Sequence, residues 1–235
     1  MNVNMEYTMK HTIKERSILR FLLEQGYSQS LIRQLRNTEN GITVGGRAVH
    51  TTRMLEPGEV LSINIREDEG TGHIVPVPMP LHIQYEDEHI LVVNKDAGVP
   101  IHPSQGNHEN TLANGIAFYF KEKGETFTYR AISRLDRNTT GLLVLAKNPL
   151  SACILSDMVK KRQIRVHLKS IGHPLPGDFL YHPDYRYIRR QALHSFRLEF
   201  PHPIKKEPLS FEAPLPEDMR FLGITSTEGL WDNDF

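Results

Sequence analysis

Residues 134–147 read Arg-Leu-Asp-Arg-Asn-Thr-Thr-Gly-Leu-Leu-Val-Leu-Ala-Lys, a polar segment that leads into an apolar run. Asp136 lies between Arg134 and Arg137, and cationic neighbours favour the ionised form of a carboxylate. The next four residues have the composition of a turn, and the five apolar residues after them are typical of a buried strand. The run therefore predicts a carboxylate held rigidly at the start of a core strand, as a catalytic group would be. A surface ion pair is the alternative for a short Arg-x-Asp-Arg pattern taken alone.

The composition is that of a globular protein, because 39% of the 235 residues are hydrophobic and 24% are charged. No apolar stretch approaches the roughly 18 residues that suggest a membrane span. The first residues are polar and lack the apolar segment of a signal peptide. The single cysteine, Cys153, permits no internal disulfide, as is usual in a reducing compartment. We therefore expect a cytoplasmic protein with no membrane partner.

Positive charge is concentrated around the run, although the formal net charge of the chain is zero. Residues 130–190 carry twelve Lys and Arg against four Asp and Glu, whereas residues 67–129 carry three against ten. A phosphate backbone would be attracted to the basic block, so this pattern favours nucleic-acid contact near Asp136. The alternative is that folding mixes the opposite charges into a neutral surface.

A first unit of α+β type is predicted over residues 12–66. Apolar residues recur there with the spacing of two helices, and Arg33 and Arg36 would share one face of the second helix. Gly45-Gly46 precedes Arg47 and is typical of a hairpin turn. Strands are expected at residues 42–44, 48–50 and 60–65.

This order of helices, hairpin and strand resembles the S-four-type RNA-binding domain, which is named for a ribosomal protein. The resemblance implies that Arg33, Arg36 and Arg47 contact RNA. A small interaction module with solvated arginines is the alternative. Residues 67–80 are expected to be a linker, since they combine charge, glycine and alternating prolines.

A second unit is predicted over residues 81–220, with a tail at residues 221–235. It contains a buried strand candidate at residues 90–94, and helices are expected over residues 111–120 and 149–159. Three further motifs are Gln-Ile-Arg-Val-His-Leu at residues 163–168, Gly-His-Pro-Leu-Pro-Gly-Asp at 172–178 and Gln-Ala-Leu-His at 191–194.

These motifs, together with residues 134–147, resemble those of the RluA-type RNA pseudouridine synthases. The resemblance implies a catalytic domain built on a mixed or antiparallel sheet. It also implies an isomerase that converts uridine to pseudouridine in ribosomal or transfer RNA. Residues 163–168 would form a strand in that domain.

The resemblance implies that Asp136 is the catalytic carboxylate, acting either as nucleophile or as base. Arg134, Arg137, Arg165 and His167 are implied to contact RNA, the last two from one face of a strand. Isomerisation neither gains nor loses electrons, so we expect no cofactor and no metal. The histidines have no spacing typical of a metal site. RNA is the expected partner of a monomeric chain.

The chain departs from the family at one place, where Arg162 directly precedes Gln163. In relatives, a strand with a base-stacking tyrosine, further strands and a Gly-Arg segment separate these two positions. We interpret the difference as an internal deletion, which would leave an exposed sheet edge. The arginine expected to pair with the catalytic carboxylate lies in the missing block, and neither Tyr129 nor Tyr181 matches the missing tyrosine.

Three functional hypotheses follow from this departure. The chain is an active isomerase, an RNA-binding protein that no longer catalyses, or an incompletely folded truncation product. A compact natural variant of the family is the alternative to a deletion.

Overall fold

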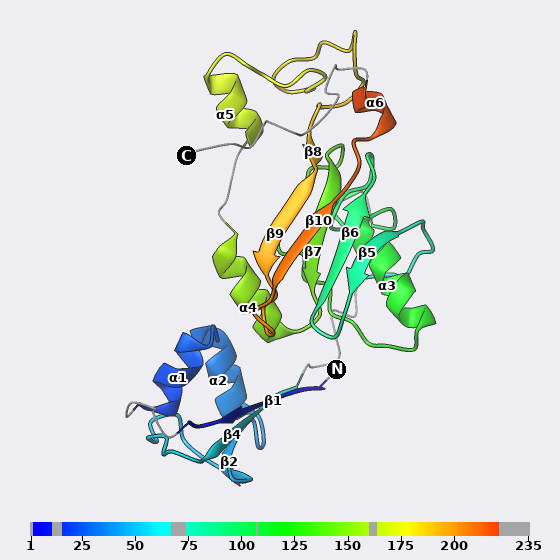
Figure 1. The fold of residues 1–235 in the computed structure, drawn as a ribbon. Coiled ribbons are helices and arrows are strands. Elements are labelled where there is room, and N and C mark those ends of the chain that lie inside the picture. Colours follow the sequence, from blue (N-terminus) through cyan, green and yellow to red (C-terminus); the bar gives the residue numbers. More distant parts are fainter. Residues whose placement is uncertain (1, 11–15, 67–73, 107, 160–163, 221–235) are drawn as a thin grey trace.

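The computed structural model describes residues 2–10, 16–66, 74–106, 108–159 and 164–220. They form a small N-terminal unit and a larger second unit, each with helices packed on a sheet (Figure 1). The prediction of an α+β fold with antiparallel and mixed sheets is therefore confirmed. Within these described residues, no helix has the length and apolar character needed to cross a bilayer.

The N-terminal unit is a four-stranded antiparallel sheet covered by two helices. Its elements are β1 (Asn2–Thr8), α1 (Ile18–Glu24), α2 (Gln29–Asn37), β2 (Ile42–Val44), β3 (Arg47–Ala48) and β4 (Val60–Arg66). The strand order is β1-β4-β2-β3. The two helices, the hairpin and the last strand lie where the sequence predicts them.

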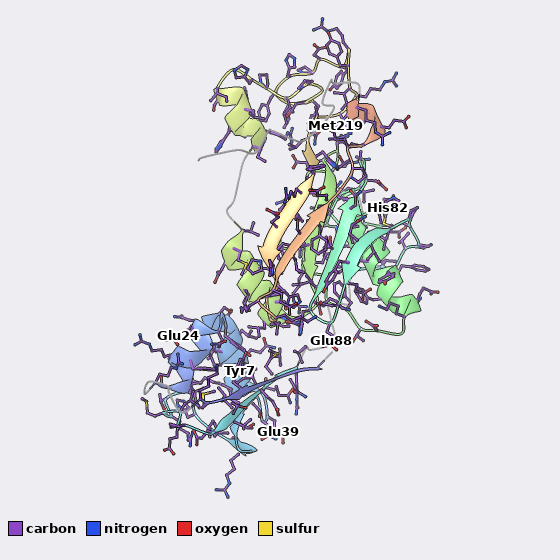
Figure 2. The ribbon with its side chains drawn as sticks, in the orientation of Figure 1. Tyr7, Glu24, Glu39, His82, Glu88 and Met219 are labelled. Atoms are coloured by element: carbon purple, nitrogen blue, oxygen red, sulfur yellow. The ribbon has the colours of Figure 1, made fainter. Side chains whose placement is uncertain are left out.

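Strand β1 lies outside the predicted range of residues 12–66 and was not expected. Val3, Met5 and Tyr7 alternate along it and pack against the core beneath the helices. The ring of Tyr7 meets that of Phe21 edge-on, with 5.2 Å between ring centroids. Figure 2 shows Tyr7 where β1 passes below α1 and α2. The period-two pattern is the signal that could have identified this strand.

The second unit is built on a four-stranded sheet of order β5-β6-β7-β8. Its strands are β5 (His82–Glu86), β6 (Ile90–Lys95), β7 (Thr140–Ala146) and β8 (His194–Ser195). The first three are antiparallel, and β8 runs parallel to β7. All seven residues of β7 are buried, which confirms the buried strand expected within the run at residues 134–147.

Both faces of this sheet are covered, because side chains of β6 and β7 alternate between two cores. Leu91, Val93, Leu143 and Leu145 pack under α3 (Leu112–Glu122). Their neighbours Ile90, Val92, Leu142 and Val144 face the opposite core. That core is closed by α4 (Pro149–Met158) and by a hairpin of β9 (Arg197–Pro201) and β10 (Pro208–Glu212).

The segment after the sheet corrects one expectation. Residues 163–168 were predicted to be a strand, but α5 (Ile164–Ser170) is a helix with no buried residue. A helix satisfies its backbone hydrogen bonds locally, whereas a strand needs an adjacent edge. The structure pairs no described strand with this segment. The proposed deletion point at Gln163 lies outside the described residues.

Helix α4 also joins the two units. Leu150 and Ile154 belong to the same buried cluster as the core of the N-terminal unit. A Cβ atom on Gly26 would lie only 2.6 Å from Cγ1 of Ile154, so the two segments approach closely there. The small unit is thus held against α4 by shared apolar burial.

Candidate active site

Asp136 lies in the turn that leads into β7. The amide of Thr139 donates to the carbonyl oxygen of Asp136 at 3.0 Å and closes this turn. Gly141 has a φ of +105°, and a Cβ atom there would overlap the backbone of Ser195. Only glycine allows β7 to lie this close to the segment containing Ser195, so the start of β7 is packed directly against that segment.

Arg165 connects Asp136 to a second carboxylate, Asp178. Its Nη1 donates to Oδ2 of Asp136 at 2.6 Å, and its Nε and Nη2 each donate to Asp178 at 2.7 Å. The Asp178 side chain is 1% exposed, whereas that of Asp136 is 51% exposed. The hydrogen bonds from Arg165 are the main reason that the pKa of Asp178 is below its usual range. A buried acid therefore holds the guanidinium in place, and the guanidinium in turn orients the exposed acid.

Asp136 borders a cavity of about 350 Å³. That volume is within the range that binds small organic groups. The lining combines apolar walls with charged and aromatic side chains: Arg134, Leu135, Asp136, Thr139, Ile164, Arg165, Val166, Tyr181 and Leu193. Within the described part of the chain, Oδ1 of Asp136 makes no hydrogen bond, so this oxygen is available to a bound molecule.

A buried lysine, Lys95, forms hydrogen bonds that stabilise the turn carrying Asp136. Nζ of Lys95 donates to the carbonyl oxygens of Asp96, Val99 and Arg137 at 2.8, 2.9 and 3.0 Å. Burial lowers the pKa of Lys95 to about 8. The same ammonium group thus links the backbone at Arg137, next to Asp136, to the loop that follows β6.

A second support comes from the segment before β8. Nη1 of Arg190 donates to the carbonyl oxygen of Asn138 at 3.1 Å, and the same guanidinium forms a two-point contact with Asp218 at 2.7 and 2.8 Å. Asp218 lies in the short helix α6 (Glu217–Arg220), whose buried Met219 is labelled in Figure 2. The turn carrying Asp136 is therefore fixed on both sides.

The structure brings together only some of the residues predicted for the site. Arg134 and Arg165 line the cavity with Asp136. Arg137 is adjacent, but its Nε donates to the carbonyl oxygen of Gly98 at 3.0 Å. His167 does not line the cavity. It was expected to share one face of a strand with Arg165, but α5 is a helix, in which positions i and i+2 point about 200° apart.

The three arginines predicted for the first unit lie away from this cavity. Arg33 and Arg36 are exposed on α2, and Arg47 is exposed on β3. Nη2 of Arg36 lies 3.1 Å from Nε2 of His50.

Four residues with a part in the site were not selected from the sequence. They are Lys95, Asp178, Tyr181 and Arg190. Asp178 ends a motif that was noted, but nothing in its spacing indicates a contact with Arg165. Tyr181 was set aside, yet it lines the cavity, whereas Tyr129 is buried against the ring of His102. No group of three or more potential metal ligands occurs among the described residues.

Comparison with known proteins identifies the family. A family model described as RNA pseudouridylate synthase matches residues 89–170. RNA pseudouridine synthase YjbO of Bacillus subtilis is 29% identical, and the alignment covers 83% of this chain and 94% of YjbO. Ribosomal large subunit pseudouridine synthase D of Zymomonas mobilis is 30% identical, with 64% of this chain and 74% of that protein covered. The chain belongs to the RNA pseudouridine synthase family. Its reaction class is accordingly the isomerisation of uridine to pseudouridine in RNA.

One solved member of the family gives a partial structural match. Human RNA Pseudouridylate Synthase Domain Containing 1 superposes with a TM-score of 0.46 and 20% identity, over 58% of this chain and 84% of that one.

Proposed function

We propose that this pseudouridine synthase acts on ribosomal RNA and that Asp136 is its catalytic carboxylate. The observation that carries this proposal is the chain of contacts from Asp136 through Arg165 to the buried Asp178, at the edge of a cavity. The Zymomonas mobilis relative is described as a ribosomal large subunit enzyme, which favours the same class of RNA here.

The reaction rearranges bonds within one nucleotide. The bond between the ring nitrogen N1 and the ribose breaks, the uracil turns, and its ring carbon C5 bonds to the same ribose carbon. The proton lost from C5 is balanced by the proton that N1 gains, so no atom or electron is exchanged overall. The target uridine has to leave the RNA stack to reach the cavity. The free Oδ1 of Asp136, at the border of the cavity, supports a role for this carboxylate as nucleophile or as base.

We also propose that the N-terminal unit binds RNA through Arg33, Arg36 and Arg47. All three side chains are exposed, and no described carboxylate forms an ion pair with any of them. Surface arginines without a carboxylate partner suit contacts with phosphates, which position an enzyme on RNA without reading its sequence.

An internal deletion remains a proposal, and three observations support it. The YjbO alignment spans 266 positions, more than the 235 residues of this chain, so that relative has segments with no counterpart here. Among the described residues, β8 pairs with β7 only at Thr140 and Gly141, and α5 has no buried residue. An intact mass of 27.0 kDa for the purified natural protein is expected, and a clearly larger mass would contradict the deletion.

The test of the proposed activity is tritium release from ribosomal RNA that contains uridine labelled at C5. We expect release with the wild-type chain and a loss of at least about 10² to 10⁴-fold with Asp136→Asn, because the amide is neither base nor nucleophile. Unchanged melting of the variant would show that the loss is chemical. Equal release by both proteins would overturn the role of Asp136.

The second hypothesis, an RNA-binding protein without catalysis, predicts a different result. Such a protein would bind ribosomal RNA with a strong dependence on salt concentration but release no label. The observation that favours it is the YjbO alignment, whose 266 positions exceed the 235 residues of this chain.

A further inference from the structure

The exposed aromatic side chains of the second unit are concentrated in one segment, which also contains the cavity-lining Tyr181. Among the described residues, every exposed Phe or Tyr side chain lies within residues 179–187. Phe179 is 56% exposed, Tyr185 48% and Tyr187 68%. Figure 1 shows this segment as the yellow loop region between α5 and β8, beyond the end of the sheet. Exposed rings of this size are unusual on a soluble surface and often mark a binding site.

Cationic side chains lie over these rings. The guanidinium carbon of Arg165 is 5.3 Å from the centroid of Phe179 and 5.6 Å from that of Tyr181. Nζ of Lys169 is 4.8 Å from the centroid of Tyr181. The guanidinium carbon of Arg186 is 5.6 Å from the centroid of Tyr187. We call these residues the aromatic–cation surface: Phe179, Tyr181, Tyr187, Arg165, Lys169 and Arg186.

The charge of this surface is positive. Residues 164–190 carry five Lys and Arg against two Asp, and four of the cations remain once the buried Arg190, which pairs with Asp218, is left out. Both carboxylates are already paired, Asp178 with Arg165 and Asp184 with Arg186. The exposed side chain of Lys169 forms no ion pair with any described carboxylate. An anionic ligand that can also stack on rings therefore complements this surface.

The surface is continuous with the candidate active site. Arg165 and Tyr181 belong both to the aromatic–cation surface and to the lining of the cavity beside Asp136. A nucleotide next to a uridine in the cavity would therefore lie near the rings of Tyr181 and Phe179, which both contact Arg165.

We infer that the aromatic–cation surface binds the unpaired nucleotides that flank the target uridine. This inference rests on the proposed function and narrows its substrate to a single-stranded segment of RNA. Aromatic rings stack with any base, and the adjacent cations attract the backbone phosphates. Duplex RNA keeps its bases stacked on one another, so the rings would contribute little to its binding.

The test compares three forms of the full chain. The variant Phe179→Ala/Tyr187→Ala removes both rings, the variant Phe179→Tyr/Tyr187→Phe keeps them, and Val75→Ala is a control that shortens an exposed apolar side chain elsewhere. The probes are a short single-stranded RNA containing one uridine with 2-aminopurine beside it, and a duplex of the same sequence. Binding is followed by fluorescence anisotropy, and stacking by quenching of the 2-aminopurine.

We expect the double alanine variant to bind the single strand about tenfold more weakly or worse, and to lose the quenching. Its affinity for the duplex should change little, and the ring-keeping variant and Val75→Ala should match the wild type. Equal single-strand affinity and quenching in the wild type and the double alanine variant would overturn the inference. So would a wild-type dimer that the double alanine variant converts to monomer, because the surface would then be covered by a second copy.

The outcomes for the two proposals are separable. A wild-type chain that quenches the 2-aminopurine fluorescence but releases no tritium would refute the proposed isomerase activity. It would still support RNA binding by the aromatic–cation surface. A wild-type chain that releases tritium while the double alanine variant binds normally would refute the stacking surface alone.

Discussion

Arg165 is the residue on which the geometry of the site depends. It contacts two carboxylates of different exposure, and it uses two of its nitrogen atoms on the buried one. A guanidinium held at two points keeps a fixed direction, which a single contact would not ensure. One oxygen of Asp136 is therefore oriented while the other stays open to the cavity.

Asp178→Asn tests this arrangement at the scale of one residue. The asparagine keeps an oxygen for the amides of Leu180 and Tyr181, but it removes the charge that holds Arg165. We expect kcat to fall by about 10²-fold, because a small displacement of a catalytic group costs that much, while KM changes little. The measurement is steady-state tritium release.

The matched control for this prediction is Asp157→Asn, on the exposed side of α4, which removes the same charge away from the cavity. It should leave kcat unchanged. An Asp178→Asn enzyme with wild-type kcat would mean that Arg165 orients Asp136 without help from Asp178.

At the scale of elements, Glu86 ties three segments together at the far end of the sheet. It lies at the end of β5 and accepts a hydrogen bond from Tyr119 of α3 at 2.6 Å and one from Lys123, the C-cap of that helix, at 2.9 Å. A third comes from Lys147 after β7, at 2.8 Å. Partial burial alone would raise the pKa of Glu86, but the hydrogen bonds outweigh it and lower the pKa to about 2. The exposed Glu88 lies nearby in the turn before β6 (Figure 2).

This shift predicts how stability depends on pH. Because the pKa of Glu86 is lower in the folded chain than in the unfolded chain, its contribution is complete above about pH 4.5 and is lost as the pH falls toward 2. Glu86→Gln should lower the free energy of unfolding by about 2 kcal/mol at pH 7, since the buried ammonium of Lys147 loses the nearer of its two carboxylate partners. The difference between variant and wild type should shrink as the solution is acidified.

Denaturant melts at a series of pH values would measure this dependence. Glu88→Gln serves as the control because its side chain is exposed, and it should follow the wild-type curve. A difference between Glu86→Gln and wild type that stays constant from pH 7 to pH 3 would rule out the linkage.

At the scale of the whole molecule, α4 fixes the N-terminal unit next to the catalytic unit. Leu150 and Ile154 are buried in the core of the smaller unit, and Sγ of Cys153 lies 3.3 Å from Oγ of Ser28. An RNA bound to the arginines of the first unit would therefore reach the catalytic unit in one preferred direction.

Gly26→Ala and Gly58→Ala form a matched pair that tests this docking. The two glycines have similar φ values, +88° and +84°, so both alanines cost about 1 to 2 kcal/mol of backbone strain. Only at Gly26 does the added methyl group meet Ile154 of the other unit. We expect Gly26→Ala alone to increase the radius of gyration in small-angle scattering, as the units separate. Identical scattering profiles for the two variants would show that the close approach does not hold the units together.

The sequence by itself determined much of the framework. The run at residues 134–147 predicted the buried strand β7, because apolar residues bounded by a turn leave few alternatives to a core strand. Helical spacing predicted α1 and α2, and Gly45-Gly46 predicted the hairpin after them. These are local properties of the chain, and a short window of residues is enough to specify them.

The tertiary structure alone decided how the site is completed. Residues 164–170 are helical rather than extended because no described strand edge lies beside them, which no local pattern reveals. The partnership of Asp136 with Arg165 and Asp178, and the place of Tyr181 in the cavity, join residues far apart in the chain. Such contacts depend on how helices and strands pack in the folded chain, and the spacing of residues in the sequence does not predict that packing.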